Sequence, residues 1–230
     1  MDATVEQLDE GPAGALNRST YRRYWMALYR RDVAAAGRIV DQCLADWKPE
    51  HIYLRLFEPS LNLSGKLWAG GSIRYQDEHF VTYHTLRFLR RVRHRFVKPD
   101  PTGPLAMATA AGQESHLIGL RMVCDFLQAD NWRIHWLPSN DRPVVRQATQ
   151  RLQPDALLIS IGLDLGLGPA RRVISDVRGA GFNGLVVVGG AAVNKDPVSR
   201  VQTLGADLTA RNGRHLVRLL RANARPRRLR

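Results

Sequence analysis

The sequence has few cysteines and no long apolar run. Cys43 and Cys124 are the two cysteines among 230 residues, and both lie in apolar segments with helical spacing. Such positions favour buried, reduced thiols over a disulfide framework. No stretch approaches the roughly 18 consecutive apolar residues that a membrane span needs, and the first residues lack the basic and apolar regions of a secretory signal. We therefore expect a cytoplasmic protein without a membrane segment.

Acidic residues are scarce compared with basic ones. The chain has 34 lysines and arginines against 21 aspartates and glutamates, a formal net charge of +13. This excess favours an acidic partner, either nucleic acid or an acidic protein surface. Arginines crowd residues 87–95 and 221–230, and the alternative is that both runs are simply solvated. No helix-turn-helix, zinc-finger or RNA-binding signature is visible, so a DNA contact would depend on these basic patches alone.

The first hundred residues show helical spacing of apolar side chains. The pattern predicts four helices, of which the second and third begin at the favourable N-terminal residues Asp32 and Pro49. Short connections between them indicate a small four-helix bundle. A break that holds Trp68 is expected over residues 64–71. The predicted helices begin near residue 19 and then cover about residues 33–47, 50–63 and 75–96.

The pattern changes after a proline-rich segment at 99–104, which cannot be helical. Apolar strands then alternate with helices, which is typical of a parallel sheet covered on both faces. Five such units fit a flavodoxin-like Rossmann domain. The predicted strands are 104–110, 133–137, 156–161, 185–188 and, more weakly, 206–209, with helices at about 116–129, 142–153, 168–180, 195–203 and 213–223.

The predicted fold is therefore α/β plus all-α, with an N-terminal four-helix bundle cap followed by a flavodoxin-like Rossmann domain that has a five-stranded parallel sheet. The predicted organisation is a flexible N-terminal arm (1–16), the helical-bundle cap (17–98), a linker (99–104), the Rossmann-like domain (105–224) and a basic tail (225–230).

A histidine motif follows the first predicted strand. Glu114, Ser115 and His116 lie in a strand–loop–helix junction, at the edge where open α/β sheets bind their ligands. Glu114 is close enough in sequence to accept a hydrogen bond from the far nitrogen of the imidazole, as the partners of metal-bound histidines do. Gly119 removes a side chain where a bulky ligand would pass. The alternative is that His116 is an ordinary cap or surface residue.

Small residues end two other predicted strands. Ser160 and Gly162 follow the third strand, and Gly189 and Gly190 follow the fourth. Together with the Glu-x-His-x-x-Gly motif, they resemble the cobalamin-binding Rossmann domains of methionine synthase, mutases and corrinoid proteins. The resemblance implies that His116 is the lower cobalt ligand and that the displaced nucleotide tail threads beside the serine and the glycines. The family usually has aspartate at position 114 and Ser-x-Leu at 160–162.

A second motif lies in the predicted bundle. Trp68, nine further residues and the pair Glu78-His79 resemble the signature of cobalamin photoreceptors related to CarH. The resemblance implies that Trp68 packs against the adenosyl group of adenosylcobalamin, with Glu78 and His79 beside it. Light would cleave the cobalt–carbon bond, and His79 would become the second histidine on the metal, together with His116. The alternative is that Trp68 belongs to the bundle core and that Glu78-His79 is an exposed helical turn.

The resemblance covers about residues 18–223 and leads to a functional prediction. CarH-type repressors carry a DNA-binding domain before the cap, whereas this chain starts almost at the cap. It therefore looks most like the stand-alone AerR/PpaA antirepressors of photosynthetic bacteria. We predict a light-sensing transcriptional regulator, not an enzyme, which binds adenosyl-, methyl- or hydroxocobalamin and acts on a repressor of the CrtJ/PpsR type.

Two alternatives share most of these residues. A corrinoid protein that carries a methyl group for a separate methyltransferase would also need His116, Ser160 and the paired glycines, but it does not require Trp68 with Glu78-His79. A degenerate sensor would have kept the fold and lost the vitamin, and the presence of His116 argues against it. The sequence does not determine the oligomeric state.

Overall fold

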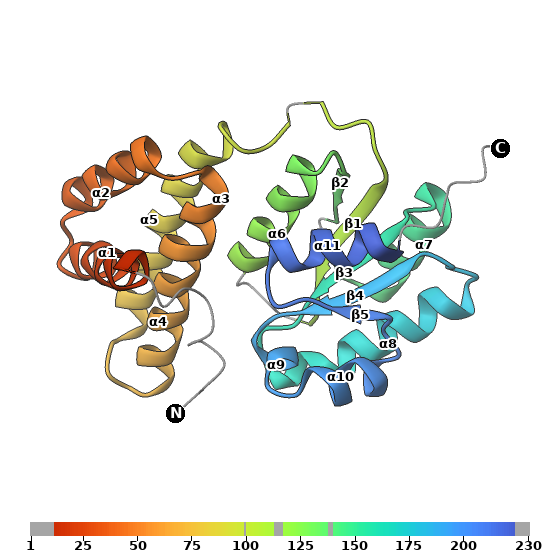
Figure 1. Cartoon of the computed structure of the whole chain (residues 1–230). Coiled ribbons are helices and arrows are strands. Elements are labelled where there is room, and N and C mark those ends of the chain that lie inside the picture. Colours follow the sequence, from red (N-terminus) through yellow and green to blue (C-terminus); the bar gives the residue numbers. More distant parts are fainter. Residues whose placement is uncertain (1–11, 99, 113–116, 138–139, 224–230) are drawn as a thin grey trace. The chain divides into compact units, whose positions relative to one another are not determined.

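The computed structural model describes residues 12–98, 100–112, 117–137 and 140–223 (Figure 1). The chain forms two compact units, and the division falls between Phe96 and Val97. Within the described residues, no helix combines the length and the apolarity that crossing a membrane requires.

The first unit is the predicted four-helix bundle. Its third helix is a continuous run in which a five-residue π-helical turn separates two α-helical parts, an arrangement often found at functional positions. The elements are α1 (Pro12–Tyr29), α2 (Val33–Asp46), α3 (Pro49–Ile52), the π-helical η1 (Tyr53–Phe57), α4 (Glu58–Ala69) and α5 (Tyr75–Arg93).

The predicted helix starts at Asp32 and Pro49 are confirmed. The side chain of Asp32 accepts a hydrogen bond from the backbone N–H of Ala35 at 2.8 Å, which satisfies one of the donors that every helix leaves free at its N-terminus. Pro49 occupies the first turn of α3, where its missing N–H removes no helical hydrogen bond.

Two expectations about the bundle are wrong. The first helix, expected to begin near residue 19, begins at Pro12, because proline is well suited to the first turn of a helix. The break expected over residues 64–71 is helical as far as Ala69, so Trp68 lies in the last turn of α4. Packing explains the second difference: Ser64 is buried, and its hydroxyl accepts a 2.7 Å hydrogen bond from the indole of Trp25.

Aromatic side chains fill the bundle interior. Tyr24 is fully buried, and its ring packs against the rings of Phe57 and Phe88 at centroid distances of 6.0 and 6.1 Å. Its hydroxyl pairs with Thr85 Oγ1 at 3.0 Å, so the one polar atom of this ring is satisfied. Burial raises the pKa of Tyr24 well above its ordinary value, and the phenol therefore stays neutral.

The second unit contains five parallel strands in the order β2-β1-β3-β4-β5, as the flavodoxin-like prediction requires. The strands are β1 (Leu105–Ala110), β2 (Arg133–Trp136), β3 (Ala156–Ser160), β4 (Leu185–Gly189) and β5 (Leu208–Thr209). The helical elements are α6 (Ile118–Ala129), α7 (Arg142–Leu152), the 3₁₀ turn η2 (Asp164–Gly166), α8 (Leu167–Gly179), α9 (Ala191–Asn194), α10 (Pro197–Leu204) and α11 (Gly213–Asn223).

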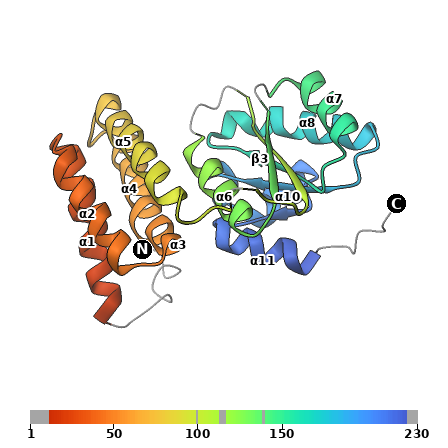
Figure 2. The ribbon, with the colours of Figure 1, turned by 90° about the horizontal axis from the view of Figure 1, so that it is seen from above.

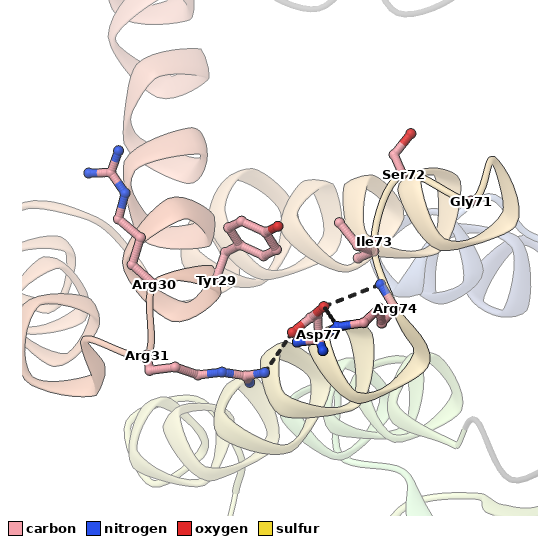
Figure 3. A pocket seen from close by; sticks show the side chains of 8 residues that line it. All are labelled: Tyr29, Arg30, Arg31, Gly71, Ser72, Ile73, Arg74 and Asp77. Atoms are coloured by element: carbon pink, nitrogen blue, oxygen red, sulfur yellow. Dashed lines mark hydrogen bonds and ion pairs between the residues drawn. The ribbon is translucent and has the colours of Figure 1, made fainter.

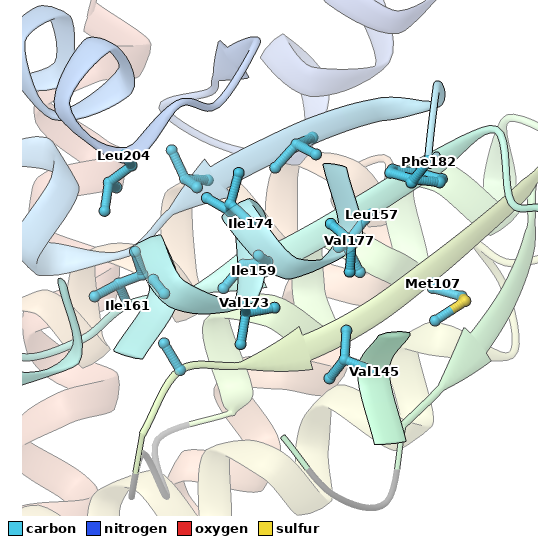
Figure 4. Packing of buried hydrophobic residues seen from close by; sticks show 14 of the residues in the cluster. Met107, Val145, Leu157, Ile159, Ile161, Val173, Ile174, Val177, Phe182 and Leu204 are labelled. Carbon is cyan, nitrogen blue, oxygen red and sulfur yellow. The ribbon is translucent and has the colours of Figure 1, made fainter. Parts of the chain in front are cut away.

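Helices cover both faces of the sheet (Figures 1 and 2). Helices α6 and α11 cover one face, where Leu120 and Leu216 pack against Ala108 and Leu158. Helices α7, α8 and α10 cover the other face, where a larger cluster forms around Ile159 (Figure 4). This burial on both sides explains why β1, β3 and β4 read as continuous apolar runs.

The prediction of reduced cysteines is confirmed. Cys43 and Cys124 are both free and buried. Burial raises the pKa of Cys43 to about 11, and it also raises the pKa of Cys124. Both groups are therefore protonated thiols at neutral pH and behave as small apolar side chains.

Candidate functional site

The first candidate site is the edge of the sheet at which the parallel strands end. The strand register pairs Ala110 with Ser160 and Ser160 with Gly189. The ends of β1, β3 and β4 are therefore neighbours, although their residues are far apart in the sequence. Strand order reverses between β1 and β3, and such a switch point is where open α/β sheets bind ligands.

The histidine motif itself cannot be placed. Glu114, Ser115 and His116 lie outside the described residues, so the roles expected of them remain predictions. Gly119, in the first turn of α6, is described and exposed. A Cβ atom added at Gly119 would meet no atom within 4 Å among the described residues, which do not include the preceding segment 113–116.

The two glycines after β4 differ in what surrounds them. A Cβ atom added at Gly190 would lie 2.5 Å from the carbonyl oxygen of Ile161, and the φ of Gly190 is 105°. Glycine is therefore required at this position by the protein's own backbone. A Cβ atom added at Gly189 would meet nothing within 4 Å in the part of the chain that the structure describes. Of the pair, Gly189 is the residue that leaves space for a ligand.

Ser160 and Gly162 flank Ile161, a buried residue whose backbone is hydrogen-bonded to the segment that follows β4. The backbone N–H of Ile161, between them, donates to the carbonyl of Gly189 at 2.8 Å, and the backbone N–H of Ala192 donates to the carbonyl of Ile161 at 3.1 Å. Both Ser160 and Gly162 are half-buried, next to the buried Ile161. The structure thus gives them a place at the edge of the sheet, and their contact with a ligand remains a prediction.

Sequence reasoning missed Thr209, at the end of β5. Thr209 pairs with Val188, the residue before Gly189. Its hydroxyl oxygen is buried, and no hydrogen-bond partner for it is found in the part of the chain that the structure describes. An unsatisfied buried hydroxyl is unfavourable by about 1–3 kcal/mol, so such an atom near a ligand edge suggests a polar ligand group. The short, weakly apolar strand gave no signal for this role.

The second candidate site is an aromatic surface on the bundle, formed by Trp68, Tyr75 and His79. The rings of Trp68 and Tyr75 meet edge to face with centroids 6.4 Å apart, and the rings of Tyr75 and His79 have centroids 3.7 Å apart. Trp68 is 39% exposed and Tyr75 is 55% exposed. Trp68 is therefore a surface residue and not part of the bundle core. Tyr75, which the motif leaves unspecified, joins the two motif rings.

The carboxylate of Glu78 lies beside the imidazole of His79. Glu78 is only 6% exposed, so Glu78-His79 is not simply an exposed turn. One carboxylate oxygen accepts a 2.7 Å hydrogen bond from the hydroxyl of Thr82, and the other lies 2.8 Å from Nδ1 of His79. A carboxylate beside one ring nitrogen favours a proton there, which leaves the other nitrogen as a metal ligand.

Part of the excess basic charge is neutralised locally. Arg91 pairs with Asp41, and Arg221 pairs with Asp130. Residues 225–230 lie outside the described part, so the basic tail is not placed. A DNA contact through the basic residues remains a prediction.

The chain matches two family models that carry the same description. A "B12 binding domain" model matches residues 104–221, and a second model, also described as a B12 binding domain, matches residues 20–91. A search of curated proteins found no match.

The solved structures that are similar to this chain include three cobalamin or corrinoid proteins. The monomethylamine corrinoid protein of Methanosarcina barkeri has a TM-score of 0.77 and 18% sequence identity, over 90% of this chain and 100% of that one. A cobalamin-binding protein from Desulfitobacterium hafniense DCB-2 (18% identity, 89% and 98% of the chains) and the methanol:cobalamin methyltransferase complex MtaBC of M. barkeri (15%, 97% and 92%) both have TM-scores of 0.49. At these identities the first structure supports the fold alone.

Proposed function

Because the chain belongs to the family of B12-binding domains and cobalamin is its cofactor, we propose that it is a corrinoid protein that carries a methyl group for a separate methyltransferase. The observation that carries this proposal is the similarity to the monomethylamine corrinoid protein, which extends over both units of this chain at a TM-score of 0.77. The proposed protein is a carrier, and the enzymatic activity would belong to its partner.

The residues at the sheet edge fit the cofactor. Cobalamin has a long nucleotide tail with hydroxyl and phosphate oxygens. The open space beside Gly119 and Gly189 offers room for this tail, and the unsatisfied hydroxyl of Thr209 offers it a hydrogen-bond donor. Bound cobalamin supplies a cobalt centre that can hold a methyl or adenosyl group, which no amino-acid side chain can do.

The chain's own residues would bind and orient the cofactor. Residues at the sheet edge would hold the tail, and His116 remains the predicted cobalt ligand. In the bundle, the carboxylate of Glu78 lies beside the imidazole of His79, and Trp68 and Tyr75 present flat apolar surfaces next to it. A carrier needs such a surface to shield a reactive group from water between encounters with its partner.

Methyl loss in the dark tests the carrier function. The chain is loaded with methylcobalamin, and loss of the methyl group to added 2-mercaptoethanol is followed by visible absorption. A carrier that shields its methyl group should release it to this thiol more slowly than free methylcobalamin does, because the thiol is not its partner. A rate no slower than that of the free cofactor would contradict the proposal.

A second candidate is the light-sensing regulator, and the arrangement of Trp68, Glu78 and His79 favours it. A methyl carrier does not require a buried carboxylate beside an accessible imidazole, whereas a sensor that exchanges a cobalt ligand for His79 would use one. Its partner would be a repressor of the CrtJ/PpsR type, and the basic residues would serve as docking or DNA-facing surfaces.

Illumination distinguishes the two candidates. The chain is loaded with adenosylcobalamin in the dark, and its spectrum is recorded before and after green light. A sensor should give a stable photoproduct with two histidine ligands, which His79→Ala abolishes. His84→Ala is the matched control, because His84 lies on the same helix and packs against Phe80. A photoproduct that is identical in wild type and His79→Ala would exclude ligand exchange through His79.

A further inference from the structure

A cavity of about 520 Å³ lies at one end of the bundle, between the C-terminal end of α1 and the loop that joins α4 to α5 (Figure 3). Tyr29, Arg30 and Arg31 line it from the first side, and Arg74 and Asp77 line it from the second. Its volume lies within the range of small-molecule sites, about 300–1,000 Å³. None of these residues belongs to the motifs that indicate cobalamin.

The cavity is positively charged. Three arginines and one carboxylate line the cavity, which leaves two positive charges. Asp77 is nearly buried; one of its oxygens lies 2.6 Å from Nη2 of Arg31, and the other lies 3.2 Å from Nε of Arg74. The hydrogen bond from Arg74 is the main reason that the pKa of Asp77 lies below its ordinary value. The carboxylate is therefore ionised at neutral pH.

Asp77 also holds two guanidinium groups in place. The side chain of Arg31 reaches across to it and lies 4.1 Å from the centroid of the Phe80 ring, a cation–π distance. Figure 3 shows Arg31 and Arg74 both turned toward Asp77. A guanidinium group has five N–H donors, so each retains donors for a ligand after pairing with the carboxylate. Positioning these groups before the ligand arrives lowers the entropic cost of binding.

Arg30 is differently placed. Figure 3 shows that it extends away from Asp77, and no acceptor for its guanidinium group is found among the described residues. Its long side chain can rotate toward the cavity at little cost, because it gives up no ion pair. Arg30 would therefore supply a third cationic group to a bound anion.

Tyr29 gives the cavity a flat wall. Its ring stacks on Trp25 with centroids 5.0 Å apart and an interplanar angle of 11°, which fixes its orientation. The residue is still 38% exposed, so part of its surface remains open. A planar ligand group could stack there while its charged end reaches the arginines.

We propose that this cavity binds a phosphate monoester whose organic part is a flat ring, such as a nucleoside monophosphate. A phosphate monoester carries a charge of about −1.5 to −2 at neutral pH, which matches the two excess positive charges. Guanidinium groups match phosphate oxygens in geometry and can donate two parallel hydrogen bonds to them. Tyr29 would contact the ring.

The test is calorimetric titration of the full chain, first without and then with bound cobalamin, with adenosine monophosphate, adenosine and inorganic phosphate as probes. The nucleotide should bind at least about tenfold more tightly than either fragment, because it alone uses the tyrosine and the arginines together. Arg30→Ala should weaken nucleotide binding by about tenfold or more, as expected for the loss of a hydrogen bond to a charged group.

Arg90→Ala is the matched control. It removes the same charge from an exposed position on α5 outside the cavity, so nucleotide affinity should stay within about twofold of wild type. Equal weakening by Arg30→Ala and Arg90→Ala would overturn the proposal, because binding would then reflect only the net charge. Binding of phosphate as tight as that of the nucleotide, or no nucleotide binding at millimolar concentration, would also overturn it. Arg30 is an exposed side chain, so this variant should fold.

Discussion

The two candidate sites are built in opposite ways. On the bundle, the site consists of side chains: the rings of Trp68, Tyr75 and His79 lie along one surface, and the carboxylate of Glu78 lies beside the last of them. At the sheet edge, the site depends largely on glycines, which have no side chain and so leave space for a ligand, as at Gly119 and Gly189.

The difference follows from the secondary structure. Residues four apart on a helix share a face, so a helical site can be assembled from a short stretch of sequence. The ends of parallel strands converge from distant segments, and a ligand reaches them only where no Cβ atom stands in the way. The following predictions test this comparison, from the largest expected effect to the smallest.

Gly190→Ala and Gly189→Ala should separate a structural glycine from one that leaves ligand space. An added Cβ atom at Gly190 would collide with the backbone of Ile161 in a conformation that only glycine adopts readily. We expect Gly190→Ala to lower the free energy of unfolding by about 3 kcal/mol or more. Gly189→Ala should fold nearly as well as wild type and bind cobalamin more weakly.

Urea unfolding and cobalamin titration measure these two effects. If Gly189→Ala binds cobalamin as tightly as wild type does, the open space beside this glycine is not part of the cofactor site.

Glu58→Gln should change the pH dependence of stability. Burial raises the pKa of Glu58 in the bundle to about 7, above the value of about 4.5 for an exposed glutamate. The folded state therefore binds a proton more tightly than the unfolded state, and stability should fall as pH rises from about 4.5 to 7 and then stay level. The total loss is at most about 3 kcal/mol, since each pKa unit corresponds to about 1.4 kcal/mol.

Thermal unfolding from pH 4.5 to 8 checks this expectation. Glu58→Gln should flatten the decline and stabilise the protein at pH 8. Glu50→Gln is the control, because Glu50 is more exposed, near the start of α3. A decline that is the same in wild type and Glu58→Gln would mean that another group causes it.

Thr209→Val tests the unsatisfied hydroxyl at the sheet edge. Valine has nearly the same shape, so it removes the unpaired polar atom without opening a cavity. The cofactor-free protein should become more stable by about 1 kcal/mol, and cobalamin should bind more weakly. Urea unfolding of the cofactor-free protein together with cobalamin titration gives both numbers. A loss of stability would show that the hydroxyl has a partner in the free protein.

Asp32→Ala and Asp196→Ala compare helix caps in the two units. Asp32 caps α2 through a 2.8 Å hydrogen bond, whereas Asp196 caps the shorter α10 through a 3.3 Å one. We expect losses of about 1 kcal/mol for Asp32→Ala and about 0.5 kcal/mol for Asp196→Ala, both measured by urea unfolding. Equal losses would show that hydrogen-bond length and helix length do not control the capping energy here.

Much of the fold could be predicted because its signals are local. The apolar strands and the helices between them determine the parallel sheet, and Asp32 marks a helix start through a hydrogen bond to a residue three positions away. The helical end of α4 could not be predicted. A hydrogen bond between Trp25 and Ser64 accompanies this helical end. These residues are 39 positions apart, so the local sequence pattern does not indicate the contact.

The candidate sites divide in the same way. The spacing of Trp68, Glu78 and His79 is visible in the sequence, but the position of Tyr75 between two of the rings is not. The paired glycines after β4 are visible in the sequence too. Only the packing shows that Gly190 must be glycine because the backbone of Ile161 lies against it, whereas Gly189 leaves space for a ligand.

The sequence by itself determined the two-unit architecture and the five-stranded parallel sheet, and its resemblance to cobalamin-binding domains indicated the cofactor. The architecture follows from the types of residues and their spacing along the chain. Three features could be known only from the tertiary structure: the unsatisfied hydroxyl of Thr209, the burial of Glu58 and the arginine-lined cavity beside Tyr29. These features depend on which distant segments approach one another, and burial and electrostatic interactions change steeply over a few ångströms of that approach.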